Sequence, residues 1–124
     1  MKWAFSLQKY GMNILLFSLF KPDQDVYQQY QKYGITVIDA NLKRKIKNLR
    51  QPNLSKLSYL QSLRPLSKTI TTFQPDILHA HYASSYGVLG YLSKFRPWLL
   101  SVWGSDIYDF PQKSWVNKGL LKRV

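Results

Sequence analysis

The feature that most constrains the fold is one stretch in the second half of the chain, residues 74–111, in which two apolar runs flank a segment of helical character. The runs cover residues 76–80 and 98–102, and a proline stands just before each of them. Proline disfavours the helical conformation in the residue before it, so each run begins after a break in any helix. Two strands joined by a connection that contains a helix run in parallel. The stretch therefore predicts a strand–helix–strand unit with both strands pointing the same way.

The segment between the two runs predicts a helix that packs closely on these strands. Val88, Leu92 and Phe95 follow one another at spacing i, i+4, i+7, which is typical of a core-facing stripe. Gly87 and Gly90 lie on neighbouring turns and have no β-carbon to hold the helix away from the strands. We expect this helix to cover the two strands.

Polar residues follow both predicted strands. His79, His81 and Tyr82 come at the end of the first, and residues 103–106 follow the second. In open parallel sheets, ligands bind outside the carboxyl ends of the strands, so we expect these two groups to face one ligand. His79 lies inside an apolar run, which favours a buried structural histidine.

The segments HAHYASSYG and SVWGSDIYDFP, residues 79–87 and 101–111, resemble the N-terminal domain of family 4 glycosyltransferases. These enzymes have two facing Rossmann-like domains, the GT-B fold. The strand-ending HAH, the small-residue helix and the GSD loop occur in the family's order and spacing. The remainder of the chain is similar to the family more loosely, from end to end.

The resemblance implies an α/β fold, an incomplete Rossmann-like parallel sheet of about four strands with flanking helices. The expected strands cover residues 13–19, 35–38, 76–80 and 98–102. Residues 1–124 would form one partial domain on the acceptor side of the enzyme. A helix leads into the first expected strand, whereas the family begins with a strand and a glycine turn. We therefore expect this chain to be a fragment without that first strand and without the C-terminal donor domain.

The same resemblance implies a glycosyltransferase of the retaining type, which moves a sugar from a nucleotide-sugar donor to a saccharide or lipid-linked acceptor in cell-surface polysaccharide synthesis. It implies no obligatory metal and no cofactor, the nucleotide sugar being a co-substrate held mainly by the C-terminal domain. We therefore expect this chain alone to be inactive.

The resemblance also places roles on individual residues. His81 and Asp106 are the candidate catalytic residues, because His81 can hydrogen-bond a sugar hydroxyl and Asp106 can orient the acceptor hydroxyl. The expected substrate-binding residues are Tyr82, Trp103, Gly104 and Ser105. Many family members carry histidine where this chain has Trp103, so no histidine role is transferred to that position.

Cysteine is absent from the chain, which excludes disulfides and thiolate metal sites and suits a reducing, cytoplasmic location. Two histidines at spacing i, i+2 without a third ligand nearby do not predict a metal site. The longest apolar run, residues 14–20, is too short to cross a bilayer.

The net charge is +12, from 18 basic and 6 acidic residues, and it favours anionic partners. Residues 41–51 combine apolar and basic positions, as in segments that lie on anionic membranes. The basic positions are Lys43, Arg44, Lys45, Lys47 and Arg50. We expect peripheral contact with the inner face of the membrane through them, and the alternative is a solvated connection.

The alternative function is a basic module that binds nucleic acid or anionic membrane without enzymatic activity. The charge favours it, but the sequence has no zinc-finger spacing and no ribonucleoprotein aromatic signature. Nucleic acid is therefore not the partner we expect.

Overall fold

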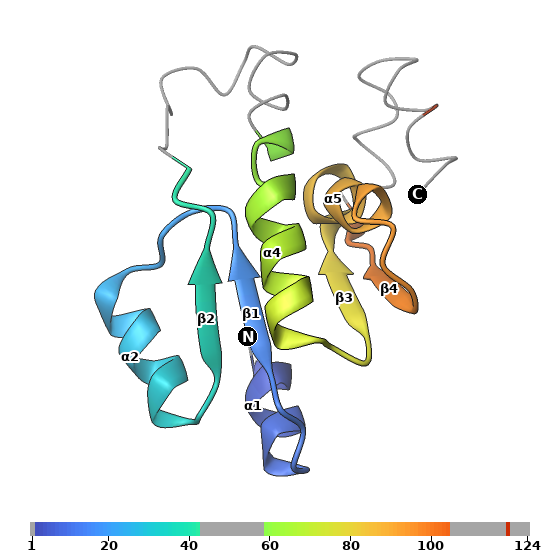
Figure 1. Cartoon of the computed structure of the whole chain (residues 1–124). Coiled ribbons are helices and arrows are strands. Elements are labelled where there is room, and N and C mark those ends of the chain that lie inside the picture. Colours follow the sequence, from blue (N-terminus) through green and yellow to red (C-terminus); the bar gives the residue numbers. More distant parts are fainter. Residues whose placement is uncertain (1, 43–58, 105–118, 120–124) are drawn as a thin grey trace. The chain divides into compact units, whose positions relative to one another are not determined.

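The computed structural model describes residues 2–42, 59–104 and 119 (Figure 1). The chain divides into two compact units, Met1–Gln51 and Pro52–Val124. The elements of the first unit are α1 (Lys2–Lys9), β1 (Leu15–Ser18), α2 (Gln24–Lys32) and β2 (Thr36–Asp39). Those of the second are α4 (Leu63–Phe73), β3 (Leu78–His81), the π-helix η1 (Tyr82–Gly87), α5 (Val88–Leu92) and β4 (Trp98–Ser101).

The first unit is built on a parallel strand pair. β1 and β2 are in register from Leu15 opposite Thr36 to Ser18 opposite Asp39, and α2 is the crossover between them. α2 ends before Gly34, whose φ of +69° is a conformation that a residue with a β-carbon rarely adopts. The glycine thus turns the chain from the helix into β2.

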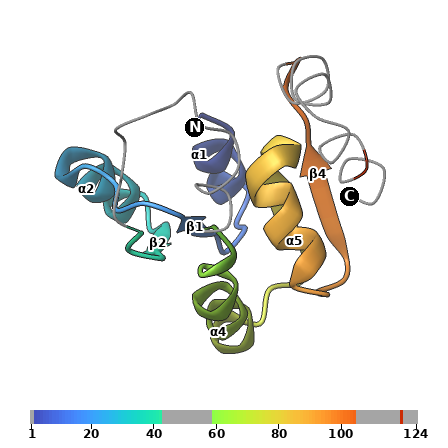
Figure 2. The same ribbon diagram turned by 90° about the horizontal axis from the view of Figure 1, so that it is seen from above.

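The core of the first unit lies where α1 and α2 meet the strand pair (Figure 2). Ala4, Tyr30 and Ile35 are buried together, and Leu16 and Val37, which are opposite one another in register, pack against them. The Phe5 ring of α1 also stacks on Tyr30 of α2, with 5.2 Å between the ring centroids. Both helices therefore cover the same face of the two strands.

The second unit repeats the parallel arrangement. β3 and β4 are in register from Leu78 opposite Trp98 to His81 opposite Ser101. The strand–helix–strand unit predicted from residues 74–111 is confirmed for its described part, and its two strands run side by side in one direction. The carboxyl ends of both strands consequently meet at one edge.

Gly90 brings the crossover helix close to this strand pair. A β-carbon at that position would lie 3.1 Å from the Trp98 ring and 3.5 Å from the Ala80 β-carbon. The close approach that the sequence predicted for this glycine is therefore present, and it leaves no room for a larger residue without a shift of Trp98.

The predicted core stripe of this helix is wrong in phase. Leu89 is buried, with 1% of its surface exposed, whereas Leu92 is 38% exposed. Phe95 lies beyond α5, which ends at Leu92. The reason is that α5 ends at Leu92, so the stripe continues past the end of the helix, and the face of Leu89 and Gly90 is the buried one.

All four predicted strands are present, each four residues long, and the α/β class with parallel strands is confirmed. Within the described residues they hydrogen-bond as two pairs, β1–β2 and β3–β4, rather than as one sheet of four. That residues 1–124 form a single domain stays a prediction.

Across residues 2–42 and 59–104, no helix is long and apolar enough to cross a membrane. The basic positions between residues 43 and 50 lie outside the described residues, so their contact with a membrane stays a prediction.

Candidate functional site

The predicted site residues gather where β3 and β4 end. His79 and His81 are the second and fourth residues of β3, and Ser101, the last residue of β4, is opposite His81. Trp103 follows two residues after β4. The parallel register is what brings these residues, more than twenty positions apart in the chain, to the same edge.

His79 is exposed, so the prediction of a buried histidine there is wrong. Its Nε2 atom lies 2.8 Å from the Ser101 hydroxyl, within hydrogen-bonding distance. Successive side chains of a strand alternate between its two faces, so His79 and His81 share one face, and their ring centroids are 4.3 Å apart. The two imidazoles thus form a polar strip along the end of β3.

His81 is partly buried, and this lowers its pKa below the ordinary value for histidine, first through desolvation and then through repulsion from His79. A histidine with a lowered pKa is neutral at pH 7, when one ring nitrogen donates a hydrogen bond and the other accepts one. A neutral imidazole binds a hydroxyl group through one ring nitrogen, as donor or as acceptor, and the Nε2 atom of His81 is buried.

Tyr82 and Trp103 form an aromatic platform beside His81. Their ring centroids are 5.9 Å apart with 26° between the ring planes, and the centroids of His81 and Trp103 are 6.5 Å apart. Tyr82 is 44% exposed and Trp103 is 51% exposed. An exposed pair of large aromatic rings offers a flat apolar face with polar groups at its edge, which suits the C–H face and hydroxyl rim of a sugar.

The backbone of Tyr82 is in the left-handed region, with φ of +68°. For a bulky residue this conformation costs about 1–3 kcal/mol, and such outliers cluster at functional sites. It arises because the helix begins at Tyr82 directly after β3 ends at His81, with no residue between them to turn the chain. The sharp turn places the Tyr82 ring against Trp103.

The remaining predicted residues are placed as follows. Gly104 is described and exposed, directly after Trp103, whereas Ser105 and Asp106 lie outside the described residues. The structure therefore brings His81, Tyr82 and Trp103 together, and the roles of Ser105 and Asp106 stay predictions.

No group of three or more metal-ligating side chains occurs in the part of the chain that the structure describes. The chemical groups gathered at this edge are the imidazoles of His79 and His81, the Ser101 hydroxyl and the exposed rings of Tyr82 and Trp103.

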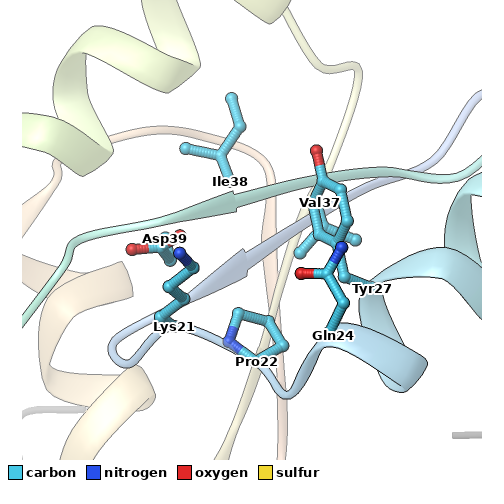
Figure 3. A pocket seen from close by; sticks show the side chains of 7 residues that line it. All are labelled: Lys21, Pro22, Gln24, Tyr27, Val37, Ile38 and Asp39. Carbon is cyan, nitrogen blue, oxygen red and sulfur yellow. The ribbon is translucent and has the colours of Figure 1, made fainter.

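The sequence did not predict a second candidate site. It is an open hollow of about 470 Å³ at the carboxyl ends of β1 and β2 (Figure 3). Its lining residues are Lys21, Pro22, Gln24, Tyr27, Val37, Ile38 and Asp39. The signal available in the sequence was Asp39 at the end of a predicted strand, in line with the polar loop after the strand before it.

The sequence profile of the glycosyl transferase 4-like family matches residues 1–124, and the chain belongs to this family. The resemblance suggested by HAHYASSYG and SVWGSDIYDFP is thereby confirmed over the whole chain. No curated protein and no solved structure matches the chain significantly.

Proposed function

We propose that this chain forms the acceptor-binding side of a retaining glycosyltransferase that takes its sugar from a nucleotide-sugar donor. The acceptor we propose is a saccharide or a lipid-linked saccharide of a cell-surface polysaccharide. Family membership supports the class of enzyme, and the geometry of the second unit supports the assignment of the acceptor.

The observation that carries the proposal is the meeting of His81 with the aromatic platform at the carboxyl ends of two parallel strands. A sugar ring stacked on Trp103 would direct its hydroxyl groups towards the neutral imidazole of His81. The strained backbone of Tyr82 supports a functional role, because packing alone would be achieved at lower cost by an unstrained residue.

In this proposal the chain contributes positioning. Holding an acceptor hydroxyl in line with the anomeric carbon of the donor converts an encounter of two molecules into a reaction within one complex. His81 holds a neighbouring hydroxyl, and Asp106 orients the attacking one. The backbone N–H groups of Gly104 and Ser105 offer donors for a hydroxyl or for developing negative charge.

Saccharide binding by the purified chain tests the acceptor assignment. Titration with oligosaccharides, followed by tryptophan fluorescence and calorimetry, should show binding that Trp103→Ala weakens by about tenfold or more, or about 1.4 kcal/mol. Leu99→Ala is the matched control, because Leu99 lies on β4 with a similar exposed fraction. Equal affinity of the Trp103→Ala and Leu99→Ala variants would contradict the proposal.

A turnover assay with candidate nucleotide sugars tests whether this chain alone can transfer a sugar. We propose little or no transfer by this chain alone, because in the family the second domain grips the donor. Robust transfer by the purified chain would show that it binds the donor itself.

We also propose peripheral contact with anionic membrane through the basic segment of residues 43–50. Co-sedimentation with vesicles of anionic lipid should fall when Lys43, Arg44 and Lys45 are replaced by glutamine. The free energy of membrane binding should weaken by roughly 1 kcal/mol per charge removed. Replacement of Lys9, Lys32 and Lys94, which are exposed elsewhere, is the control. Equal loss in both triple variants would mean that net charge alone governs binding.

A further inference from the structure

The hollow of the first unit has the position and size of a small-molecule site. Its lining comes from the loop after β1, from the first turns of α2 and from the end of β2 (Figure 3). Open parallel sheets bind ligands in this place, outside the carboxyl ends of their strands. The volume of about 470 Å³ is within the range of small-molecule sites in proteins, about 300–1,000 Å³.

The walls of the hollow are held in place by hydrogen bonds near both strand ends. The Ser18 hydroxyl donates to the Phe20 carbonyl oxygen at 2.6 Å, inside the loop that follows β1. The backbone N–H of Ala40 donates to the Ser18 carbonyl oxygen at 2.8 Å, which ties the end of β2 to the end of β1. A site held in this way is largely formed before a ligand arrives, which lowers the entropic cost of binding.

Asp39 is the fixed polar group of the hollow. Its Oδ1 atom accepts a hydrogen bond from the backbone N–H of Asn41 at 2.8 Å, and Asn41 has the left-handed φ of +50° that this tight turn requires. The bond orients the carboxylate and leaves both lone pairs of Oδ2 for two further donors. Figure 3 shows Lys21 and Asp39 beside one another on one side of the hollow, with Gln24 on the other.

The loop between β1 and α2 argues against a phosphate ligand. Phosphate loops rely on glycines that let backbone N–H groups approach the anion. Residues 19–23 contain no glycine, and Pro22 has no N–H to donate. The carboxylate of Asp39 would also repel an anion, so the ligand that fits is neutral and rich in hydroxyl groups.

We infer that the hollow binds a vicinal diol, with the Asp39 carboxylate accepting hydrogen bonds from two neighbouring hydroxyls and Lys21 and Gln24 binding further oxygens. An acidic side chain after the second strand of a β–α–β unit binds ribose hydroxyls in this manner in dinucleotide-binding folds. Pro22 and Val37 supply apolar surface for the carbon face of the ligand. This site goes beyond the proposed function, because none of its residues belongs to the platform of the second unit.

Two sources share the diol chemistry, a ribonucleoside and a pyranose, and the experiment separates them. Calorimetry and NMR titration of the full chain would use uridine against 2′-deoxyuridine, and methyl mannoside against its 3-deoxy derivative, which keeps no vicinal diol. Binding should shift the amide signals of residues 20, 21, 23, 24 and 37–41, and loss of one diol hydroxyl should weaken binding at least fivefold. The arm that binds identifies the source.

Asp39→Asn keeps the shape of the side chain but removes its charge, and it should weaken binding of the diol probe about tenfold or more. Asp25→Asn is the matched control, since Asp25 is exposed on α2 and does not line the hollow. Gln24→Ala should also weaken binding, with Gln28→Ala on the same helix as its control. Thermal unfolding checks that each variant is folded.

Trp103→Ala distinguishes this site from the proposed acceptor site, because it should leave the amide shifts of the hollow unchanged. The inference is overturned if neither probe shifts these amides, if the deoxy probes bind equally well, or if both pairs of variants behave alike.

Discussion

The two parallel strand–helix–strand units of this chain differ in how the helix follows the first strand. In the first unit, residues 19–23 separate β1 from α2, whereas in the second unit η1 begins at Tyr82, directly after β3 ends at His81. The longer connection leaves a hollow lined by Lys21 and Asp39 at the carboxyl edge. The direct connection instead places the aromatic platform and two imidazoles there.

This difference shows that the length of one loop decides the chemistry of a sheet edge. A loop of several residues carries the chain outwards and lets polar side chains surround a space. With no loop, the chain turns sharply through a strained residue, and large rings fill the edge. The same β–α–β arrangement thus presents two kinds of surface at its carboxyl edge.

The largest expected effect comes from truncating one fully buried side chain in each unit. Ile35→Ala in the first unit and Leu89→Ala in the second should each lower the free energy of unfolding by about 2–5 kcal/mol, because both side chains are 1% exposed and leave cavities. Denaturant unfolding measures the change. The controls are Ile38→Ala, three residues after Ile35, and Leu92→Ala, three residues after Leu89; both are 36–38% exposed, with expected losses below about 1 kcal/mol. Equal losses at Leu89 and Leu92 would mean that Leu92 contributes to the core, as the predicted stripe had it.

A smaller effect distinguishes the roles of one glycine in each unit. Gly90→Ala should lower the free energy of unfolding by about 1 kcal/mol, since crowding against Trp98 costs about 1–3 kcal/mol and the better helix propensity returns about 1. Gly34→Ala should lose about 1–2 kcal/mol for a different reason, its φ of +69°. Trp98→Leu should therefore rescue Gly90→Ala and leave the loss at Gly34→Ala unchanged. If Trp98→Leu rescued both variants, crowding against Trp98 would not be the specific cause of the loss at Gly90.

The strained turn of the second unit predicts opposite changes in stability and binding. Tyr82→Asn should raise the free energy of unfolding by about 0.5–1 kcal/mol, because asparagine tolerates the left-handed conformation. The same change removes half of the platform and should weaken saccharide binding. Tyr91→Asn, on α5 and similarly exposed, should show no stabilisation. A destabilised Tyr82→Asn variant would mean that the Trp103 contact outweighs the strain.

The smallest effect is a pH dependence confined to the second unit. Burial and the charge of His79 lower the pKa of His81, so the folded state binds its proton less well than the unfolded state. The associated stability is complete above about pH 6.5 and is lost as the pH falls through the lower pKa of the folded state. Saccharide affinity should fall by a few fold over the same range, from about pH 7 to about pH 5.

His81→Gln should remove the pH dependence of both stability and saccharide affinity. His79→Gln should move that dependence to higher pH, because it removes the charge repulsion that lowers the pKa of His81. The diol affinity of the first unit, measured over the same range, serves as the control because no histidine lines the hollow. A profile unaffected by His81→Gln would assign the dependence to another group.

Much of the fold was accessible from local patterns. Each predicted strand lies where an apolar run follows a helix-ending glycine or proline, and all four are present. The parallel direction of β3 and β4 also followed from the sequence, because a helix-containing connection of that length joins parallel strands. The core stripe of α5 was wrong because the apolar spacing continues to Phe95, whereas the helix ends at Leu92 and buries the face of Leu89 and Gly90.

The site was predictable in part for the same reason. His81, Tyr82 and Trp103 were identified by their place after strands, whereas the exposure of His79 was not, since an apolar run does not show which strand face is covered. The hollow was missed because Lys21 and Asp39 are separated by a whole crossover and become neighbours only when β1 and β2 pair in register.

By itself, the sequence determined the elements, their direction and the family, because these depend on short-range periodicity, on backbone preferences of glycine and proline, and on the order of motifs. Tertiary structure decided which strands pair, how far each helix stands from its strands, and which polar groups share a space. Those outcomes depend on the fit of side chains such as Phe5 against Tyr30, and such contacts form between positions that are distant along the chain.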